Sequence, residues 1–384
     1  MMSRRSVLLA TLALSGFVTS FGAHVVATNL PTYAEMVGAG AFTIGLLIAV
    51  YDFAELFAKP AAGLIADRRG MKPVLLLGLV VFIIGSLLFL IISPRLLLLV
   101  RFVQGLGAAA LSTVSISLVA RHFENARGRA FGVYNAIKGS GYVIAPAVGG
   151  LLASWHGFAT IFIVSASIGF LALLASVFLP NDPGGRLEDD EELSLLQSLR
   201  IFRDPRLMPI YAVIVINMFL VGILFGFLPV YVHGLGYTAT QSGSVVSLAT
   251  AAYLLIQPVA GVLADRYAMR TTVLLGLLVA ALSIMAITFA SGWILIVMVI
   301  AAGIGIGTVW TNSDALVSAS ASPSQLGASI GAAQSFKEFG DMVGPLLVGA
   351  LTQLFGVRIG FVTCGAIAVM LLVVLVRSPV FGAR

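Results

Sequence analysis

The amino-acid sequence predicts an all-α membrane protein with twelve transmembrane helices. The chain of 384 residues is 59% hydrophobic and 10% charged, whereas an average soluble domain is about 25% charged. Its apolar residues form repeated runs of about twenty residues, which is the length that crosses about 30 Å of hydrocarbon. Its Lys and Arg residues gather in alternate segments between these runs, which is the charge asymmetry typical of membrane proteins.

Twelve apolar runs follow one another along the chain. The first could instead be read as a signal peptide, because Arg4 and Arg5 precede it, but it continues past any cleavage site to Leu30. The 41 glycines fit this interpretation, because small residues let helices approach closely in lipid. The predicted spans are 7–31, 41–64, 73–93, 96–120, 130–153, 157–179, 208–232, 240–264, 271–290, 292–318, 326–353 and 357–379.

The basic residues predict the orientation. If the N-terminus lies in the cytoplasm, the outside loops contain only Arg95 and Arg358 of the 22 Lys and Arg residues. The positive-inside rule therefore predicts a multi-pass protein of the cell (inner) membrane with both termini in the cytoplasm. The positions of the basic residues that give the net charge of +6 are explained by this topology. We therefore expect the lipid bilayer as a partner, and not a nucleic acid.

One long loop, residues 180–207, divides the predicted helices into an N-terminal bundle of six (1–179) and a C-terminal bundle of six (208–384). The loop contains a short amphipathic segment, Leu193 to Phe202, that we expect on the inner membrane surface. The two bundles repeat each other at an offset of 198–199 residues. Since six spans is an even number, the two bundles are predicted to be parallel, pseudo-symmetric repeats. Matching pairs include Pro60 and Pro258, Gly105 and Gly303, Lys138 and Lys337, and Pro146 and Pro345.

The loop between the second and third runs resembles a signature of the major facilitator superfamily. The family pattern is Gly-x-x-x-Asp-(Arg/Lys)-x-Gly-(Arg/Lys)-(Arg/Lys), and this sequence departs from it at Met71. The resemblance implies the major facilitator fold and a loop that latches the cytoplasmic side. It assigns this gating role to Gly63, Asp67, Arg68, Gly70 and Lys72.

Two further motifs carry the same resemblance. Leu97, Arg101 and Gln104 in the fourth run are similar to a family motif whose buried arginine is linked to proton transfer. The fifth run resembles the antiporter motif, with Ala145 replacing one glycine. This motif implies a proton-coupled exporter of small molecules or drugs, although Asn29-Leu30-Pro31 does not match a drug-exporter signature well. The family resemblance as a whole implies a monomer. The antiporter-type residues are Gly132, Gly141, Pro146, Gly149 and Gly150.

Nine ionisable residues interrupt the apolar runs. A charge near the bilayer centre costs about 2.5–3.5 kcal/mol, so most of the nine must face the protein interior or a wet cavity. We expect Asp314 to be solvated, because it lies near the end of its run. The nine are Asp52, Glu55, Lys59, Arg101, Lys138, Asp314, Lys337, Glu338 and Asp341.

Helical spacing suggests where the charges of the second and eleventh runs meet. Asp52 and Lys59 share one face of the second helix, and Lys337 and Asp341 share one face of the eleventh. The family resemblance makes these two helices neighbours across the interface between the bundles. Four acids and two bases would leave uncompensated negative charge when all are ionised, so one or two acids could carry a proton. The predicted interdomain charge cluster is Asp52, Glu55, Lys59, Lys337, Glu338 and Asp341.

A simpler alternative remains open for the same residues. Glu55–Lys59 and Lys337–Asp341 could be i, i+4 ion pairs that only neutralise each other.

Polar residues of the first, fourth and fifth runs are predicted to line a central substrate cavity. His24 is equally well explained as a packed histidine. With the carboxylates it could also form a metal site, but no two histidines have metal-ligand spacing in a shared helix. We therefore expect no metal and no cofactor, with the proton as coupling ion. The predicted cavity residues are His24, Asn29, Arg101, Lys138, Tyr134 and Tyr142.

Together these features favour a secondary active transporter that moves a small organic molecule by alternating access, through proton-coupled export. One alternative is a proton symporter that imports a polar or anionic metabolite, using Arg101, Lys138 and Lys337 as anion partners. A uniporter or lipid flippase independent of any gradient, and a non-transporting receptor, also remain open. We expect no enzyme, because the sequence contains no nucleophile–base constellation and no phosphate loop.

Overall fold

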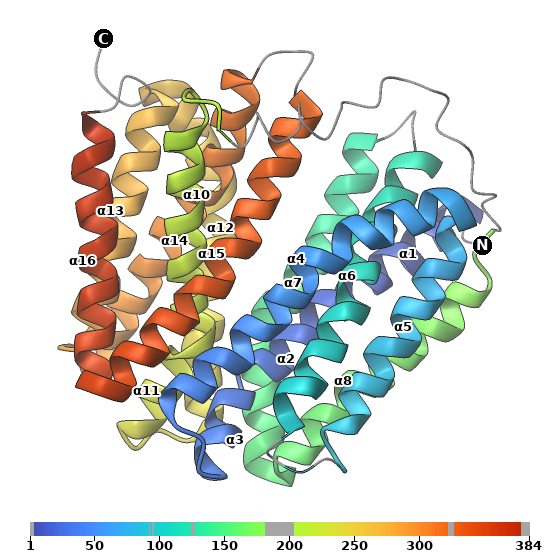
Figure 1. The fold of residues 1–384 in the computed structure, drawn as a ribbon, viewed down its shortest axis with the longest axis horizontal. Coiled ribbons are helices and arrows are strands. Elements are labelled where there is room, and N and C mark those ends of the chain that lie inside the picture. Colours follow the sequence, from blue (N-terminus) through green and yellow to red (C-terminus); the bar gives the residue numbers. More distant parts are fainter. Residues whose placement is uncertain are drawn as a thin grey trace. The chain divides into compact units, whose positions relative to one another are not determined.

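The computed structural model describes residues 4–91, 93, 96–123, 127–180, 203–321 and 326–377, and the regular structure within these ranges is helical (Figure 1). In the first half of the chain the helices are α1 (Arg4–Phe17), a π-helical turn η1 (Val18–Gly22), α2 (Ala23–Ala27), α3 (Leu30–Met36), α4 (Ala41–Arg69), α5 (Met71–Leu88), α6 (Leu97–His122), α7 (Arg127–His156) and α8 (Phe158–Val177). In the second half they are α10 (Met208–Gly226), α11 (Leu228–Gly234), α12 (Ala239–Tyr267), α13 (Met269–Ile287), α14 (Gly292–Ser320), α15 (Leu326–Phe355) and α16 (Val357–Val376).

The predicted membrane helices are confirmed. Within the described ranges, 11 helical segments are long and apolar enough to cross a membrane, and each coincides with a predicted span. The remaining predicted span corresponds to α15, a helix of 30 residues. α15 is not among the 11 segments, and it carries three charged residues near its middle: Lys337, Glu338 and Asp341.

The helices form two compact units. Unit 1 contains Met1–Ala39, Val50–Glu188 and Val232–Ser247, and unit 2 contains Gly40–Ala49, Asp189–Tyr231 and Leu248–Arg384. α4 and α12 therefore each contribute to both units. The predicted division into residues 1–179 and 208–384 stays a prediction, and most of the loop between them, residues 181–202, lies outside the described residues.

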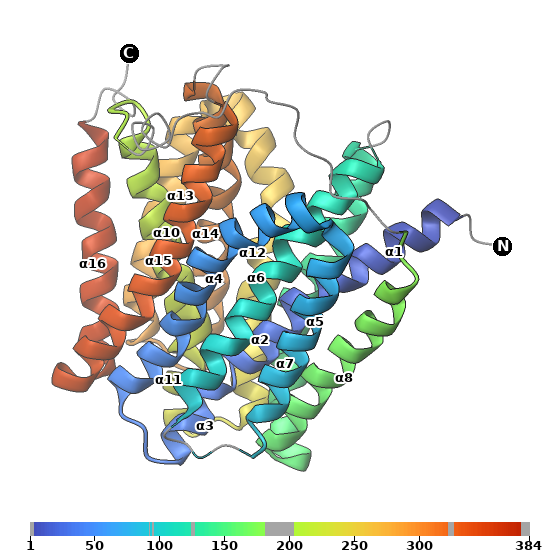
Figure 2. The same cartoon turned by 45° about the vertical axis from the view of Figure 1, so that its right-hand side comes forward.

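Within each unit, helices that are consecutive in the chain pack along one another. In unit 1, α5 packs along α6 and α8, and its buried side chains Leu75, Leu79 and Phe82 belong to the hydrophobic core (Figures 1 and 2). In unit 2, α13 packs against α14 and α16, and α10 packs along α15. The hydrophobic outer faces of these helices are exposed in the protein, as expected for surfaces that contact lipid.

Glycines allow two helix pairs to approach closely, and the two contacts are repeat mates. In unit 1, a Cβ atom added to Gly243 of α12 would lie 2.9 Å from the carbonyl carbon of Pro146 in α7. In unit 2, a Cβ atom on Gly45 of α4 would lie 3.0 Å from the carbonyl carbon of Pro345 in α15. Both distances are too short for a methyl group, so each contact requires glycine.

The turn between α12 and α13 is strained. Ala268 has φ 80°, and among the described residues no other non-glycine residue has a positive φ. Its repeat mate Gly70 has φ 95°. A side chain disfavours this backbone conformation because the Cβ atom crowds the neighbouring peptide groups.

A methyl group at Gly243 should destabilise the protein. We expect Gly243→Ala to lower the free energy of unfolding by about 1–3 kcal/mol, because the new Cβ atom must push α12 away from the backbone of α7. Gly261→Ala in the same helix is the matched control, since no atom lies within 4 Å of the Cβ position there. The measurement is the melting temperature of the purified protein in detergent. Equal melting temperatures for the two variants would contradict the packing argument.

Removing the Cβ atom of Ala268 should have the opposite effect. We expect Ala268→Gly to raise the free energy of unfolding by about 1 kcal/mol, because a strained backbone position costs about 1–3 kcal/mol. The reciprocal change Gly70→Ala should lower the melting temperature by introducing the same strain. A lower melting temperature for Ala268→Gly would show that the turn is not strained.

Candidate functional site

A buried arginine occupies the interior of unit 1. Arg101 of α6 is 2% exposed, and its guanidinium carbon lies 4.1 Å from the centre of the Tyr51 ring of α4. Its Nη1 donates a hydrogen bond of 2.6 Å to Gln104 Oε1. Its Nε has no hydrogen-bond partner among the described residues. The structure thus holds a cation in a dry environment with one donor unsatisfied, which is a costly arrangement.

Gln104 extends this site into a chain of polar contacts. Its Nε2 donates to Ser86 Oγ of α5 at 3.1 Å, and Ser86 Oγ lies 3.3 Å from Ser165 Oγ of α8. The Ser165 hydroxyl donates to the carbonyl oxygen of Gly22 at the end of η1. Since Ser86, Gln104 and Ser165 are all buried, the network links Arg101 to the irregular turn of the first span.

Carboxylates of α4 balance part of the arginine charge. Asp52 and Glu55 lie within electrostatic range of Arg101. The buried Glu55 also pairs with Lys59 at 2.6 Å, which is the i, i+4 ion pair that the sequence offered as an alternative. In unit 1, two of the predicted coupling carboxylates therefore lie within electrostatic range of a buried cation, and one of them pairs with the predicted Lys59.

The π-helical turn η1 connects the first span to α7 and to His24. The hydroxyl of Ser20 donates to the carbonyl oxygen of Lys138 in α7 at 2.6 Å, and His24 Nδ1 lies 2.8 Å from Ser20 O. The His24 and Tyr142 rings meet edge to face with centroids 4.3 Å apart. Arg101 and Lys138 both act electrostatically on His24. The structure thus brings together four of the predicted cavity residues, at a π-turn of the kind often found at functional sites.

The other two predicted cavity residues lie in packed surroundings. Asn29 is buried at the start of α3, and its Nδ2 donates to Val25 O at 2.9 Å. Tyr134 is fully buried in the hydrophobic core, where its hydroxyl lies 2.7 Å from Ser115 Oγ. Their contribution to a substrate cavity remains a prediction.

The antiporter-type motif of α7 is a series of close helix contacts. A Cβ atom on Gly141 would lie 2.8 Å from the backbone nitrogen of Phe21 in η1, and one on Gly149 would lie 3.0 Å from Val25 of α2. Gly150 faces Ala239 at the start of α12. Pro146 lies inside α7 between these contacts, while the surroundings of Gly132 lie outside the described residues. The motif therefore fits α7 against the first span and α12.

Hydroxyl groups add to the contact between α7 and α12. The backbone nitrogen of Ala147, directly after Pro146, donates to Ser247 Oγ at 2.9 Å. The Thr240 hydroxyl donates to Ser154 Oγ, also at 2.9 Å. The repeat mate of Ser247 at the 198-residue offset is Ala49, so this hydroxyl contact has no counterpart there.

The predicted gating loop is a tight turn between α4 and α5. Gly70 has positive φ between the two helices, which suits glycine. Lys72 Nζ donates to Leu179 O at 2.6 Å, a carbonyl just after the end of α8, where helical carbonyls lack intrahelical partners. Arg68 is exposed and Gly63 lies in α4, while the Asp67 side chain is outside the described residues. The latching function itself remains a prediction.

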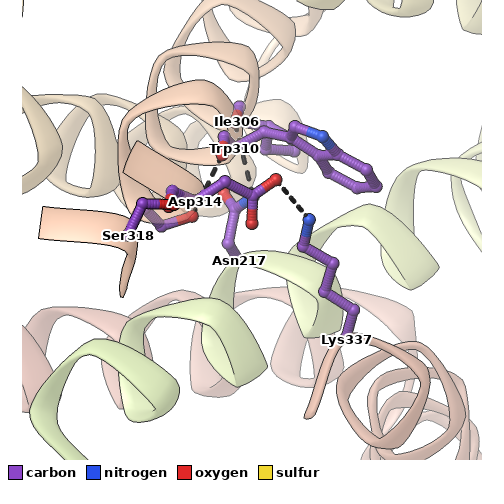
Figure 3. A network of polar contacts seen from close by, with 7 residues as sticks. Asn217, Ile306, Trp310, Asp314, Ser318 and Lys337 are labelled. Atoms are coloured by element: carbon purple, nitrogen blue, oxygen red, sulfur yellow. Dashed lines mark hydrogen bonds and ion pairs between the residues drawn. The ribbon is translucent and has the colours of Figure 1, made fainter. Parts of the chain in front are cut away.

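Unit 2 contains an ion pair that the sequence did not suggest. Lys337 Nζ of α15 lies 2.6 Å from Asp314 Oδ2 of α14 and 4.5 Å from the centre of the Trp310 ring (Figure 3). A Lys337–Asp341 pair within one helix was the alternative that the sequence offered, and the structure shows Lys337 bound to Asp314 of the neighbouring helix. The Asp314 side chain is 41% exposed, as expected for a solvated residue, but it lies more than one turn inside α14 and binds a buried lysine.

Asn217 of α10 is the other residue that sequence reasoning missed. It is buried, and its Nδ2 donates to Ile306 O of α14 at 3.3 Å (Figure 3). No sequence signal could have connected Asn217 with α14 or Lys337 with Asp314, because these contacts arise from the packing of three helices. The predicted cluster of Asp52, Glu55 and Lys59 with Lys337, Glu338 and Asp341 involves residues of both units and stays a prediction. Among the residues that the structure describes, no three His, Cys, Asp or Glu side chains are grouped as metal ligands.

Gln104→Leu should destabilise unit 1 by about 1–3 kcal/mol, because it leaves a buried Arg101 donor and the Ser86 hydroxyl without this partner. Gln334→Leu, at an exposed position of α15, is the control that changes the same chemistry without breaking the network. Melting temperatures in detergent measure the difference. Equal melting temperatures for the two variants would show that the network does not contribute to stability.

Comparisons with known proteins place the chain among transporters. The family model described as Major Facilitator Superfamily matches residues 12–250 and 210–382. A multidrug resistance protein, MdtG, of Salmonella arizonae is 26% identical over 372 residues, which cover 91% of this chain and 90% of that protein. MdtG of Citrobacter koseri is also 26% identical, over 366 residues with the same coverage.

Solved structures share the fold at low sequence identity. The nucleoside transporter NupG has a TM-score of 0.84 and 14% identity, with 98% of this chain and 100% of that chain covered. A D-xylose-proton symporter has a TM-score of 0.79 and 14% identity, with 98% of each chain covered. At these identities the likeness concerns the fold alone.

Proposed function

We propose, from the premise that this chain belongs to the Major Facilitator Superfamily, that it exports a small organic molecule by proton-coupled antiport. Membership makes it a multi-pass membrane transporter. The direction of transport, the coupling ion, the monomeric state and the cytoplasmic position of both termini belong to the proposal. We further propose that it works by alternating access in the inner membrane.

One observation supports proton coupling above the others. Glu55, Arg101 and Lys337 are buried in helices long enough to cross the membrane. Charged groups inside membrane helices are expensive and usually belong to ion or substrate pathways. Both units contain such groups next to carboxylates, and carboxylates can gain or lose a proton as water reaches them from alternate sides.

Two observations favour export of a small organic molecule. The relatives with 26% identity are named multidrug resistance proteins. In addition, the antiporter-type glycines Gly141, Gly149 and Gly150 each make a close helix contact, as their motif requires. The 26% identity leaves the substrate class wider than drugs, so we propose only a small organic molecule.

Proton-coupled import of an anionic metabolite is the second candidate. The specific observation in its favour is the grouping of Arg101, Lys138 and His24 in unit 1, where the unsatisfied Nε of Arg101 could donate to an anion. The direction of proton movement separates the two candidates, because an antiporter and a symporter move protons in opposite directions relative to the substrate.

Substrate-dependent proton flux tests the proposal. The purified protein is reconstituted in liposomes that contain a pH-sensitive dye, a pH gradient is imposed, and pools of small organic molecules are added. We expect protons to move against the substrate, and we expect neutral variants of the coupling carboxylates to reduce this flux. The variants are Asp52→Asn, Glu55→Gln, Glu338→Gln and Asp341→Asn, with the exposed Glu35→Gln as control.

The opposite results are equally informative. Protons that accompany the substrate would replace antiport by symport. Substrate movement that is equal with and without a gradient, and unchanged in all four variants, would replace coupled transport by a uniporter or lipid flippase.

A further inference from the structure

The Asp314–Lys337 ion pair of unit 2 joins one buried side chain to one that is partly exposed. The side chain of Lys337 is 6% exposed, whereas that of Asp314 is 41% exposed. The buried ammonium depends on this carboxylate, since Asp314 Oδ2 accepts its hydrogen bond at 2.6 Å. The exposed part of the carboxylate remains open to water, so a proton can reach Asp314 although its partner is shielded.

The surroundings offer the ammonium another place to bind. A lysine ammonium has three N–H donors and no acceptor. The face of the Trp310 ring lies 4.5 Å from Lys337 Nζ and attracts a cation. Figure 3 shows the Trp310 ring beside the Asp314–Lys337 pair.

The repeat shows that the acid belongs to one half only. Lys138 is the repeat mate of Lys337 at an offset of 199 residues. At the offset of 198 residues that relates α6 to α14, Asp314 corresponds to Ile116 and Trp310 to Ser112. Both halves therefore retain the lysine, but only the second has a carboxylate and an aromatic ring at the matching positions.

Few other charged groups lie on the helices packed against α14. On α15 they are Glu338 and Asp341 besides Lys337, α10 has no charged residue and contributes Tyr211, and α13 has Arg270 in its first turn. α12 also touches α14, because Asn312 donates to Ala260 O, and it contributes Tyr253, Arg266 and Tyr267 near this contact. The Asp265 side chain lies outside the described residues.

We infer that Asp314 is a proton-binding residue of unit 2 and that Lys337 is its switchable counter-ion, an inference that rests on the proposed proton-coupled transport. A proton from water adds to the carboxylate oxygen and is later returned to water, so the pair changes from net neutral to net charge +1. Neutral Asp314 releases the ammonium, which is then held by the Trp310 ring. Because Asp314 lies on α14 and Lys337 on α15, protonation alters the contact between these helices.

Trp310 provides a readout that needs no substrate. The chain has three tryptophans, and Trp155 and Trp293 are exposed. Replacing both by Phe leaves Trp310 as the sole tryptophan, whose emission is titrated from neutral to acidic pH in detergent. We expect a pH-dependent step in this protein and its loss in the same protein with Asp314→Asn, which should resemble the acidic form at all pH values.

Two further variants serve as controls for the fluorescence titration. Glu55→Gln is the matched control, because it neutralises the carboxylate of the other ion pair and should retain the step. Asp314→Glu keeps the carboxylate and should restore a step. If Asp314→Asn does not fold, as judged by size-exclusion chromatography, Lys337→Gln is titrated instead, and retention of the full step there would overturn the inference.

Persistence of the full step in Asp314→Asn would also overturn the inference, because another group would then carry the proton. The antiport proposal would survive that result, since it does not require Asp314. Failure of antiport appears separately, as absent proton flux in liposomes, and does not change the fluorescence titration.

Discussion

The cost of a charge in hydrocarbon determines how this molecule is organised. A buried ionisable group inside a span needs a partner within the protein, because neither water nor a lipid headgroup can solvate it there. Arg101 has the Tyr51 ring and Gln104, Glu55 has Lys59, and Lys337 has Asp314. These partners come from different helices in two of the three cases, so the charges constrain which helices must be neighbours.

Close packing is the second constraint, and it follows from the same solvent. Lipid provides little hydrophobic force between helices, so association depends on backbone proximity. Gly243 and Gly45 allow contacts with the backbones at Pro146 and Pro345. Residues of this kind tolerate no added methyl group, whereas Gly261 does, so glycine content alone does not reveal which glycines matter.

The sequence predicted the features that depend on local patterns. Span length and hydropathy located the 11 helices that are long and apolar enough to cross a membrane, together with the long helix α15, and helical spacing identified the Glu55–Lys59 pair. The sequence did not predict the Asp314–Lys337 pair or the contact of Asn217 with α14, because residues on different helices meet only after the helices pack. The π-helical turn at Val18–Gly22 was missed for a related reason. Its polar residues, such as Ser20, bond to α7, and no periodicity in the first span reports that contact.

The repeat explains why the two halves of the chain have different chemistry on a similar scaffold. Packing positions are retained in pairs, as at Pro146 and Pro345, because both halves face the same problem of helix contact in lipid. Charged positions are retained only in part, since Lys138 and Lys337 match but Asp314 corresponds to Ile116. A transporter that used both halves alike would need the acid in both. The loss of symmetry at the acid, with symmetry kept at the glycines and prolines, therefore separates the residues that shape the scaffold from those that give it a function.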